Sequence, residues 1–144
     1  MIIDDLQLTG ALQISLNNEI VHQCDNLVVT AGKNWVAGRF KDGSIPDEMS
    51  HMAIGSAATA AAAGNTALAT ELNRIALTTD GGTVSTNTVQ YDASWTSAAA
   101  AYAIKEAGIF NAATGGTMLA RTTFAVINKG TDDTVSISWT ITVS

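Results

Sequence analysis

Charged residues are scarce in this chain of 144 residues. Lys, Arg, Asp and Glu make up 14% of it, well below the roughly 25% typical of soluble domains. Cations are scarcest, with 7 Lys and Arg against 13 Asp and Glu, so the formal net charge is −6. Nucleic acids and anionic membranes bind clusters of Lys and Arg. We therefore expect neither nucleic acid nor a membrane as a partner.

Cysteine and proline are nearly absent, with one residue of each. The lone Cys24 cannot form an intrachain disulfide, which is compatible with a reducing compartment. No stretch approaches the ~18 consecutive apolar residues of a transmembrane helix. The N-terminal Met-Ile-Ile-Asp-Asp lacks the basic and apolar regions of a signal peptide. We expect residues 1–144 to form a single domain without either targeting feature.

The clearest structural signal is the last stretch, Thr134–Ser144, in which apolar residues alternate with Ser and Thr. A period of two places the apolar side chains on one face, which is typical of a half-buried β-strand. β-Branched residues and Trp suit such a strand. The apolar set is Val135, Ile137, Trp139, Ile141 and Val143.

Shorter strand-like segments fill the rest of the chain, separated by turns rich in Asn and Gly. Gln7–Leu16 and Ile20–Cys24 flank Asn17-Asn18, which is the pattern of a β-hairpin. Many short strands at close intervals predict an all-β antiparallel sandwich or barrel-like domain. The other expected strands are Met52–Gly55, Arg74–Thr79, Val89–Trp95, Tyr102–Phe110 and Met118–Phe124, the last continued by Val126-Ile127.

One short helix is expected near residues 30–40. Thr30 is the candidate N-cap. Two glycines within the segment weaken its intrinsic preference, so helical form would depend on packing. The candidates for its inner face are Trp35, Val36 and Phe40.

Three further segments lie outside the expected strands. Lys41–Glu48 has the composition of a surface loop. Ser56–Gly64 is nearly all Ala and is predicted to be a loop, because Ala alone cannot anchor a helix this short. Leu68 and Leu72 are spaced for a single helical turn.

Candidate catalytic or metal-binding residues are few. His22 and Cys24 share one face of a strand, whereas His51 lies elsewhere. A zinc site needs three or four suitable ligands, and no CxxC or HxxxH pairing exists here. A nucleophilic triad would need Cys24 or a Ser with His and a carboxylate, and the chain has no GxSxG elbow. We therefore expect no catalytic, metal-binding or cofactor-binding residues, and a protein that is not an enzyme.

Paired glycines and paired acids are predicted to be turns. Gly115-Gly116 lacks the Lys-Ser/Thr of a P-loop, and Lys129-Gly130-Thr131 has the reverse order. The acidic pairs Asp4-Asp5, Asp47-Glu48 and Asp132-Asp133 lack the spacing of a calcium loop. A cation that bridges subunits at Asp132-Asp133 is the alternative to a solvated turn there.

Glu106 is the one acid within an otherwise apolar predicted strand. A buried acid is costly unless it is paired. Arg74 and Arg121 also lie within predicted strands, so an ion pair between Glu106 and one of them is expected.

Aromatic residues are expected mainly in the core, because most alternate with polar residues on strands. The alternative is an exposed platform that binds carbohydrate. The residues in question are Trp35, Trp95, Trp139, Tyr91, Tyr102 and the three Phe.

Several stretches from Asn26 onward resemble a family of small structural proteins of tailed bacteriophages. The most specific part is Glu-Ala-Gly-Ile-Phe-Asn followed by Gly-Gly-Thr-Met-Leu-Ala-Arg and a terminal alternating strand. The stretches are Asn26–Phe40, Ser50–Ser56, Thr66–Thr79, Glu106–Phe124 and Ile127–Ser144.

The resemblance implies a virion protein assembled in the host cytoplasm, and it implies no catalytic residues. It points to an exterior fibre, collar or tail-appendage component, with a capsid decoration protein as the alternative within this class. It also suggests a homotrimer that contacts other virion proteins of the tail, neck or capsid. Residues 1–25, which match less clearly, are the candidate docking hairpin. A glycan-binding module for host recognition is the alternative from another class.

Overall fold

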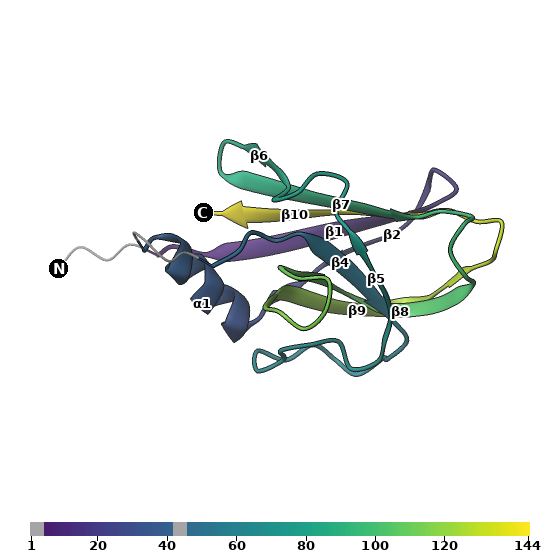
Figure 1. Cartoon of the computed structure of the whole chain (residues 1–144), viewed down its shortest axis with the longest axis horizontal. Helices are drawn as coiled ribbons and strands as arrows, with labels where there is room; N and C mark the ends of the chain where they lie inside the picture. The colour runs from purple at the N-terminus through teal and green to yellow at the C-terminus, as the bar shows by residue number, and fades with distance from the viewer. Residues whose placement is uncertain (1–4, 42–45) are drawn as a thin grey trace.

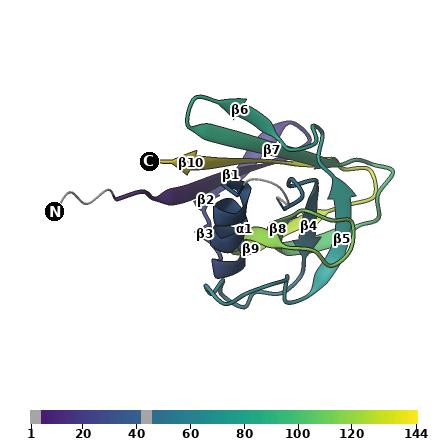
Figure 2. The same cartoon turned by 60° about the vertical axis from the view of Figure 1, so that its left-hand side comes forward.

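The computed structural model describes residues 5–41 and 46–144 and shows a sandwich of two antiparallel five-stranded sheets (Figures 1 and 2). The prediction of an all-β antiparallel domain with one short helix is confirmed. Sheet A contains, in spatial order, β2 (Glu19–Asp25), β1 (Leu8–Leu16), β10 (Val135–Val143), β7 (Thr88–Trp95) and β6 (Thr83–Ser85). Sheet B contains β3 (Leu27–Val28), β9 (Met118–Lys129), β8 (Tyr102–Phe110), β4 (His51–Gly55) and β5 (Glu71–Ala76).

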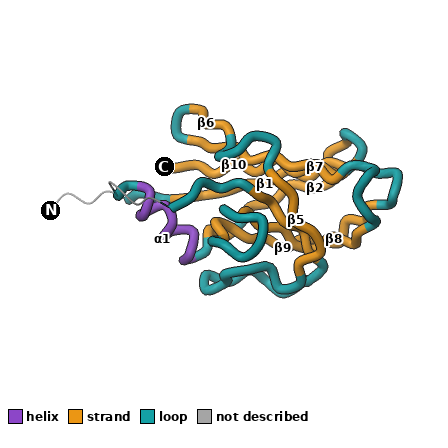
Figure 3. Tube along the Cα trace, viewed as in Figure 1, coloured by secondary structure: helices purple, strands orange, loops and turns teal. Residues whose placement is uncertain are grey.

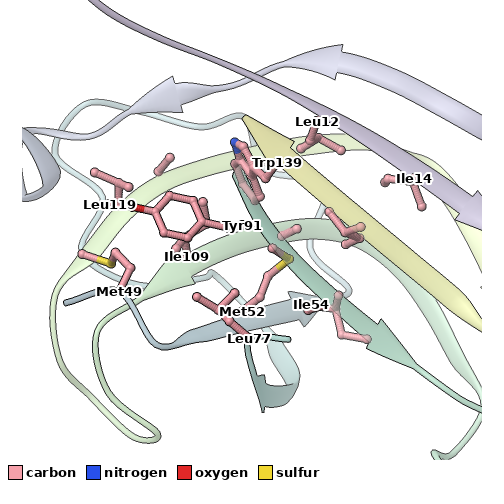
Figure 4. Packing of buried hydrophobic residues seen from close by; sticks show 14 of the residues in the cluster. Leu12, Ile14, Met49, Met52, Ile54, Leu77, Tyr91, Ile109, Leu119 and Trp139 are labelled. Atoms are coloured by element: carbon pink, nitrogen blue, oxygen red, sulfur yellow. The ribbon is translucent and has the colours of Figure 1, made fainter. Parts of the chain in front are cut away.

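Strand β10 lies at the centre of sheet A, paired with β1 on one side and β7 on the other. Four of its five alternating apolar residues are at most 6% exposed, whereas Val143 is 38% exposed. Trp139 packs between the sheets with Leu12 and Tyr91, above Met52 and Ile109 of sheet B (Figure 4). The terminal strand therefore organises the core as its alternation predicts.

The N-terminal hairpin is an integral part of the sandwich. Asn17 and Asn18 both have positive φ, 52° and 67°, as a two-residue type I′ hairpin turn requires. Leu12 and Ile14 of β1 are only 2% and 1% exposed. Removing this hairpin would expose β10 and open the core, so the part from Leu8 onward belongs to the sandwich. A docking role for residues 1–25 stays a prediction. Residues 1–4 lie outside the described ranges.

Helix α1 (Thr30–Arg39) differs from its prediction in two details. The N-cap is Val29 rather than Thr30, and no side chain caps it. Phe40 is 80% exposed instead of buried, whereas Trp35 and Val36 pack against the core as predicted. The reason is that α1 approaches sheet B through Gly32, where an added Cβ would lie 2.1 Å from the Leu119 carbonyl oxygen. The faces beside this contact are therefore half-buried at best.

The Ala-rich segment is a loop, as predicted, and it covers the face of sheet B turned away from sheet A (teal in Figure 3). The predicted helical turn at Leu68 and Leu72 is wrong, because Leu72 belongs to β5 and is exposed. Leu68 instead lies in the loop, buried with Phe110 and Met118. Strand β5 begins at Glu71 and ends at Ala76 rather than covering Arg74–Thr79.

Other expected elements agree with the structure where it describes them. Strands β7, β8 and β9 lie within about two residues of their predicted positions, and β9 runs on to Lys129. Part of the predicted loop Lys41–Glu48 falls on residues 42–45, outside the described ranges. Within those ranges no helix is long and apolar enough to span a membrane.

Truncating Ile14 tests whether the hairpin belongs to the core. We expect Ile14→Ala to lower the free energy of unfolding by about 2–5 kcal/mol, because a buried aliphatic side chain leaves a cavity. Gln13→Ala, its neighbour on the half-exposed outer face, should change stability by no more than about 0.5 kcal/mol. Urea denaturation of both variants measures the difference. Equal stability of the two would contradict an integral hairpin.

Candidate functional site

A buried ion pair joins the middle of strands β8 and β9. Arg121 donates from Nε and Nη2 to Oε2 of Glu106 at 3.0 and 2.8 Å. The two side chains are 1% and 0% exposed. The expected pairing of Glu106 is therefore confirmed, and its partner is Arg121 rather than Arg74.

The remaining acceptor capacity of Glu106 is used by the loop that leads from β4 to β5. Its Oε1 accepts the N–H of Ala57 at 3.3 Å and that of Thr70 at 2.8 Å. Its Oε2 also accepts the N–H of Ala69 at 3.1 Å. One carboxylate thus holds both ends of residues 56–70.

Arg121 holds the middle of the same loop. Its Nη2 donates to the Thr59 carbonyl at 2.9 Å, and its Nη1 donates to the Ala60 carbonyl at 3.3 Å and to Asn65 Oδ1 at 3.0 Å. Each of these hydrogen bonds joins the buried side chain of Glu106 or Arg121 to the loop. The arrangement therefore orders an uncharged surface loop, and neither charge has a free lone pair or donor directed at solvent.

Burial alone would raise the pKa of the Glu106 carboxyl. The hydrogen bonds from the Thr70 N–H, the Arg121 guanidinium and the Ala69 N–H, together with the positive charge of Arg121, outweigh burial and hold that pKa below its ordinary value of 4.5. A lowered pKa keeps a structural carboxylate charged. A general acid that works at neutral pH would instead need a raised pKa. Glu106 therefore stays ionised near neutral pH.

Arg74 lies on the same face of sheet B, at the edge strand β5. Its guanidinium lies 3.7 Å from the centre of the Phe110 ring and donates to Glu71 Oε1. It also donates to the carbonyls of Ala112 and Gly115 at 3.0 and 2.9 Å. The predicted turn at Gly115-Gly116 is confirmed by positive φ at both glycines, 59° and 73°. Arg74 thus tethers this turn.

The candidate residues Cys24, His22 and His51 do not come together as a catalytic or metal site. Cys24 Sγ lies 3.7 Å from Thr122 Oγ1, and burial raises the pKa of its thiol, which opposes thiolate chemistry. The His22 ring packs 5.5 Å from the Phe124 ring. His51 lies in the other sheet, where Nδ1 contacts the Ser50 hydroxyl. Across residues 5–41 and 46–144, no group of three His, Cys, Asp or Glu could hold a metal ion.

The pair Asp132-Asp133 forms a turn. Asp133 accepts the Asn17 side-chain amide at 2.9 Å and the Gly130 N–H at 2.7 Å. The hydrogen bond from Asn17, followed by that from Gly130, holds the pKa of Asp133 below its ordinary range. The carboxylate is engaged within its own chain, as a turn requires. Of the other acidic pairs, Asp4 lies outside the described residues, and Asp47 and Glu48 are exposed.

The large aromatic side chains are mostly core residues. Trp95, Trp139 and Tyr91 are at most 3% exposed, and Trp139 Nε1 donates to Asn26 Oδ1 at 2.6 Å. Trp35 is half-buried and donates to the Asp47 carbonyl at 2.7 Å. These residues therefore do not form the exposed platform that carbohydrate binding would use.

Lys129 is a buried cation that the sequence reasoning missed. It is 2% exposed and donates from Nζ to the carbonyls of Ala99, Ala100 and Gly130 at 3.4, 3.4 and 3.0 Å. The available signal was its position two residues after the buried Ile127, on the same face of β9. Like Arg121, it stabilises loops by donating hydrogen bonds to their carbonyl groups.

An apolar groove is the most distinctive feature of the surface. It lies where α1 meets the start of β1 and the end of β10. Leu6 is 65% exposed, Phe40 80% and Val143 38%. We call this surface the end groove; its lining residues are Leu6, Gln7, Leu8, Lys33, Val36, Ala37, Phe40 and Val143. Sequence reasoning missed it, because it placed Phe40 in the core.

The outer face of sheet A is polar, and the strands of this sheet contain three acids, Glu19, Asp25 and Asp92. None of its five strands contains Lys or Arg. Side chains on this face bond to one another, as Ser94 does to Ser136 at 2.8 Å and Gln23 to Gln13 at 3.1 Å. The face therefore presents mainly hydroxyl, amide and carboxylate groups.

No protein-family model, curated protein or solved structure matches the chain.

Neutralising Glu106 tests the ion pair. Glu106→Gln leaves Arg121 buried without a countercharge, so we expect a loss of about 3–5 kcal/mol in the free energy of unfolding. The matched control is Glu71→Gln, which breaks the partly exposed pair with Arg74 and should cost no more than about 1 kcal/mol. Denaturant titration measures both. Equal losses would contradict a dominant role for the buried pair.

Acid should destabilise the protein through the same carboxylate. Because the pKa of Glu106 is lower in the folded chain than its ordinary value of 4.5, the unfolded chain binds the proton first. Its contribution is therefore complete above that value and declines as the pH falls through the folded pKa. Unfolding measured from pH 6 down to pH 3 should show a shallower decline in a folded Glu106→Gln variant. Parallel declines would contradict this.

Proposed function

We propose that this chain is a non-enzymatic structural protein of a tailed-bacteriophage particle. It acts by self-assembly and by docking on the particle exterior, as a fibre, collar or tail-appendage component. The observation that carries the proposal is the end groove, an exposed apolar surface built on rigid elements. The resemblance of the stretches from Asn26 onward to phage structural proteins supplies the biological setting.

The end groove has the properties of a protein contact. Contiguous exposed apolar surface on a folded domain marks sites of interaction. Phe40 is the most exposed of the large hydrophobic residues that the structure describes. It follows the last residue of α1 and lies close to Leu6 and Val143 across the groove. An aromatic ring beside aliphatic residues is typical of an interface anchor.

The rest of the surface is suited to close packing between proteins. Charged residues are depleted from interface centres, and the loop 56–70 contains no charged residue. The loop is held by Glu106 and Arg121, so docking against it would cost little conformational entropy. These features favour assembly as the mode of action.

The same surfaces would serve a capsid decoration protein. Location on the particle distinguishes the two, since decoration would place the chain across the capsid lattice and an appendage would confine it to the neck or tail. A trimer is the expected oligomer in either case.

Replacing Phe40 tests the role of the end groove. We expect the purified chain to be an oligomer by light scattering, with a mass three times the 14.9 kDa of the chain. Phe40→Ser should weaken association roughly 30-fold or more, because losing an interface anchor costs about 2 kcal/mol. Val126→Ser removes an aliphatic side chain that is 47% exposed outside the groove and should leave the mass unchanged.

Melting curves should show that both variants remain folded. A wild-type chain that stays monomeric at millimolar concentration would contradict the proposal.

A further inference from the structure

The loop 56–70 leaves and rejoins the sandwich at one point. The Ser56 N–H donates to the Thr70 carbonyl at 3.0 Å. Between these residues the chain runs along the outside of sheet B, away from sheet A (Figures 1 and 2). Compact surface loops whose ends lie together in this way are Ω-loops. Because its two ends are adjacent, the loop can move off sheet B without displacing a strand.

Apolar contacts hold the loop at one place. Leu68 is its one buried residue, and it packs with Phe110 and Met118 on the outer face of sheet B. Most of the other loop residues are exposed Ala and Thr. Within the described residues, the main core between the sheets includes nothing from 56–70. That core therefore stays packed when the loop leaves the sheet.

Polar contacts hold the loop mainly through two side chains. Glu106 accepts N–H groups from both ends of the loop, and Arg121 donates to the oxygens between them. A further bond runs from the Thr30 N–H at the start of α1 to the Ala63 carbonyl at 2.8 Å. Because one carboxylate serves both ends, neither end can detach without weakening the hold on the other.

Opening the loop hydrates the ion pair without separating it. Glu106 and Arg121 lie beneath the loop on the outer face of sheet B, so water can replace the backbone groups that the loop withdraws. The released backbone also regains conformational entropy. Since both sheets and the main core remain intact, opening costs less free energy than global unfolding.

We propose that the loop 56–70 opens and closes as one unit on a sandwich that stays folded, with the Glu106–Arg121 pair as the latch that keeps it closed. Opening withdraws Leu68 from Phe110 and Met118, so the latch controls access to an apolar patch on sheet B. This device goes beyond the proposed function and does not depend on it, because every contact that carries it lies within one chain.

Native-state hydrogen exchange, followed by NMR at constant pH, tests the opening. The amides of Ala57, Ala69 and Thr70 report on the loop, and those of β10, which is paired on both sides, report on the sandwich. We expect the three loop amides to share one protection factor, at least roughly tenfold below that of the β10 amides. Urea well below the unfolding midpoint should accelerate loop exchange only slightly, because opening exposes little surface. Exchange of both sets with the same protection and the full urea dependence would overturn the inference.

Ile14→Ala separates loop opening from global unfolding. This change weakens the core equally in the closed and open forms, so β10 exchange should accelerate at least roughly 30-fold. Loop exchange should stay within about twofold of wild type. Equal acceleration of both sets would mean that the loop leaves only when the sandwich unfolds, which overturns the inference.

Leu68→Ala tests whether the loop moves as one unit. The change removes the apolar anchor near one end, and all three loop amides, including Ala57 at the other end, should exchange at least roughly 30-fold faster. The control Leu72→Ala truncates a leucine that is 38% exposed on β5 and should leave loop exchange within about twofold. Acceleration confined to Ala69 and Thr70 would show fraying at one end and contradict a single unit.

Arg121→Lys tests the latch. A lysine can still pair with Glu106, but it lacks the planar fork of donors and cannot also reach the three loop oxygens that Arg121 binds. We expect the loop amides to exchange at least roughly tenfold faster, with circular dichroism establishing that the variant is folded. Unchanged loop exchange in the folded variant would overturn the role of the pair as a latch.

Discussion

The structure depends on the ion pair between Glu106 and Arg121. Taking two charges out of water costs several kcal/mol per ion, and this cost is offset only when the remaining donors and acceptors are satisfied. The loop 56–70 supplies those partners through its backbone. The loop is mostly Ala, and Leu68 is its one large apolar side chain. The pair and the loop therefore stabilise each other, and together they complete the outer face of sheet B.

This use of buried charge explains where the Lys and Arg side chains of the molecule lie. Arg74, Arg121 and Lys129 all bind carbonyls that belong to loops or turns. Few cations are left for the surface, and those near the end groove lie on or beside α1. The exterior consequently exposes few cations, and the loop 56–70 is uncharged.

The strand pattern was predictable because burial on one face imposes a period of two, as in β10, and because Asn17-Asn18 suits a type I′ turn. Pairing of Glu106 was predictable from the cost of a lone buried acid, but its partner depended on which strands are neighbours. Phe40, Leu72 and Lys129 were misplaced or missed because tertiary contacts decide their burial. The end groove combines residues from both ends of the chain, so no local pattern reveals it.

An electron cryomicroscopy map of the assembled particle tests the central claim most directly. The account predicts this chain in repeated copies on the exterior, with the end groove covered by a neighbouring protein. A particle that lacks the chain, or one in which every end groove faces solvent, would contradict it.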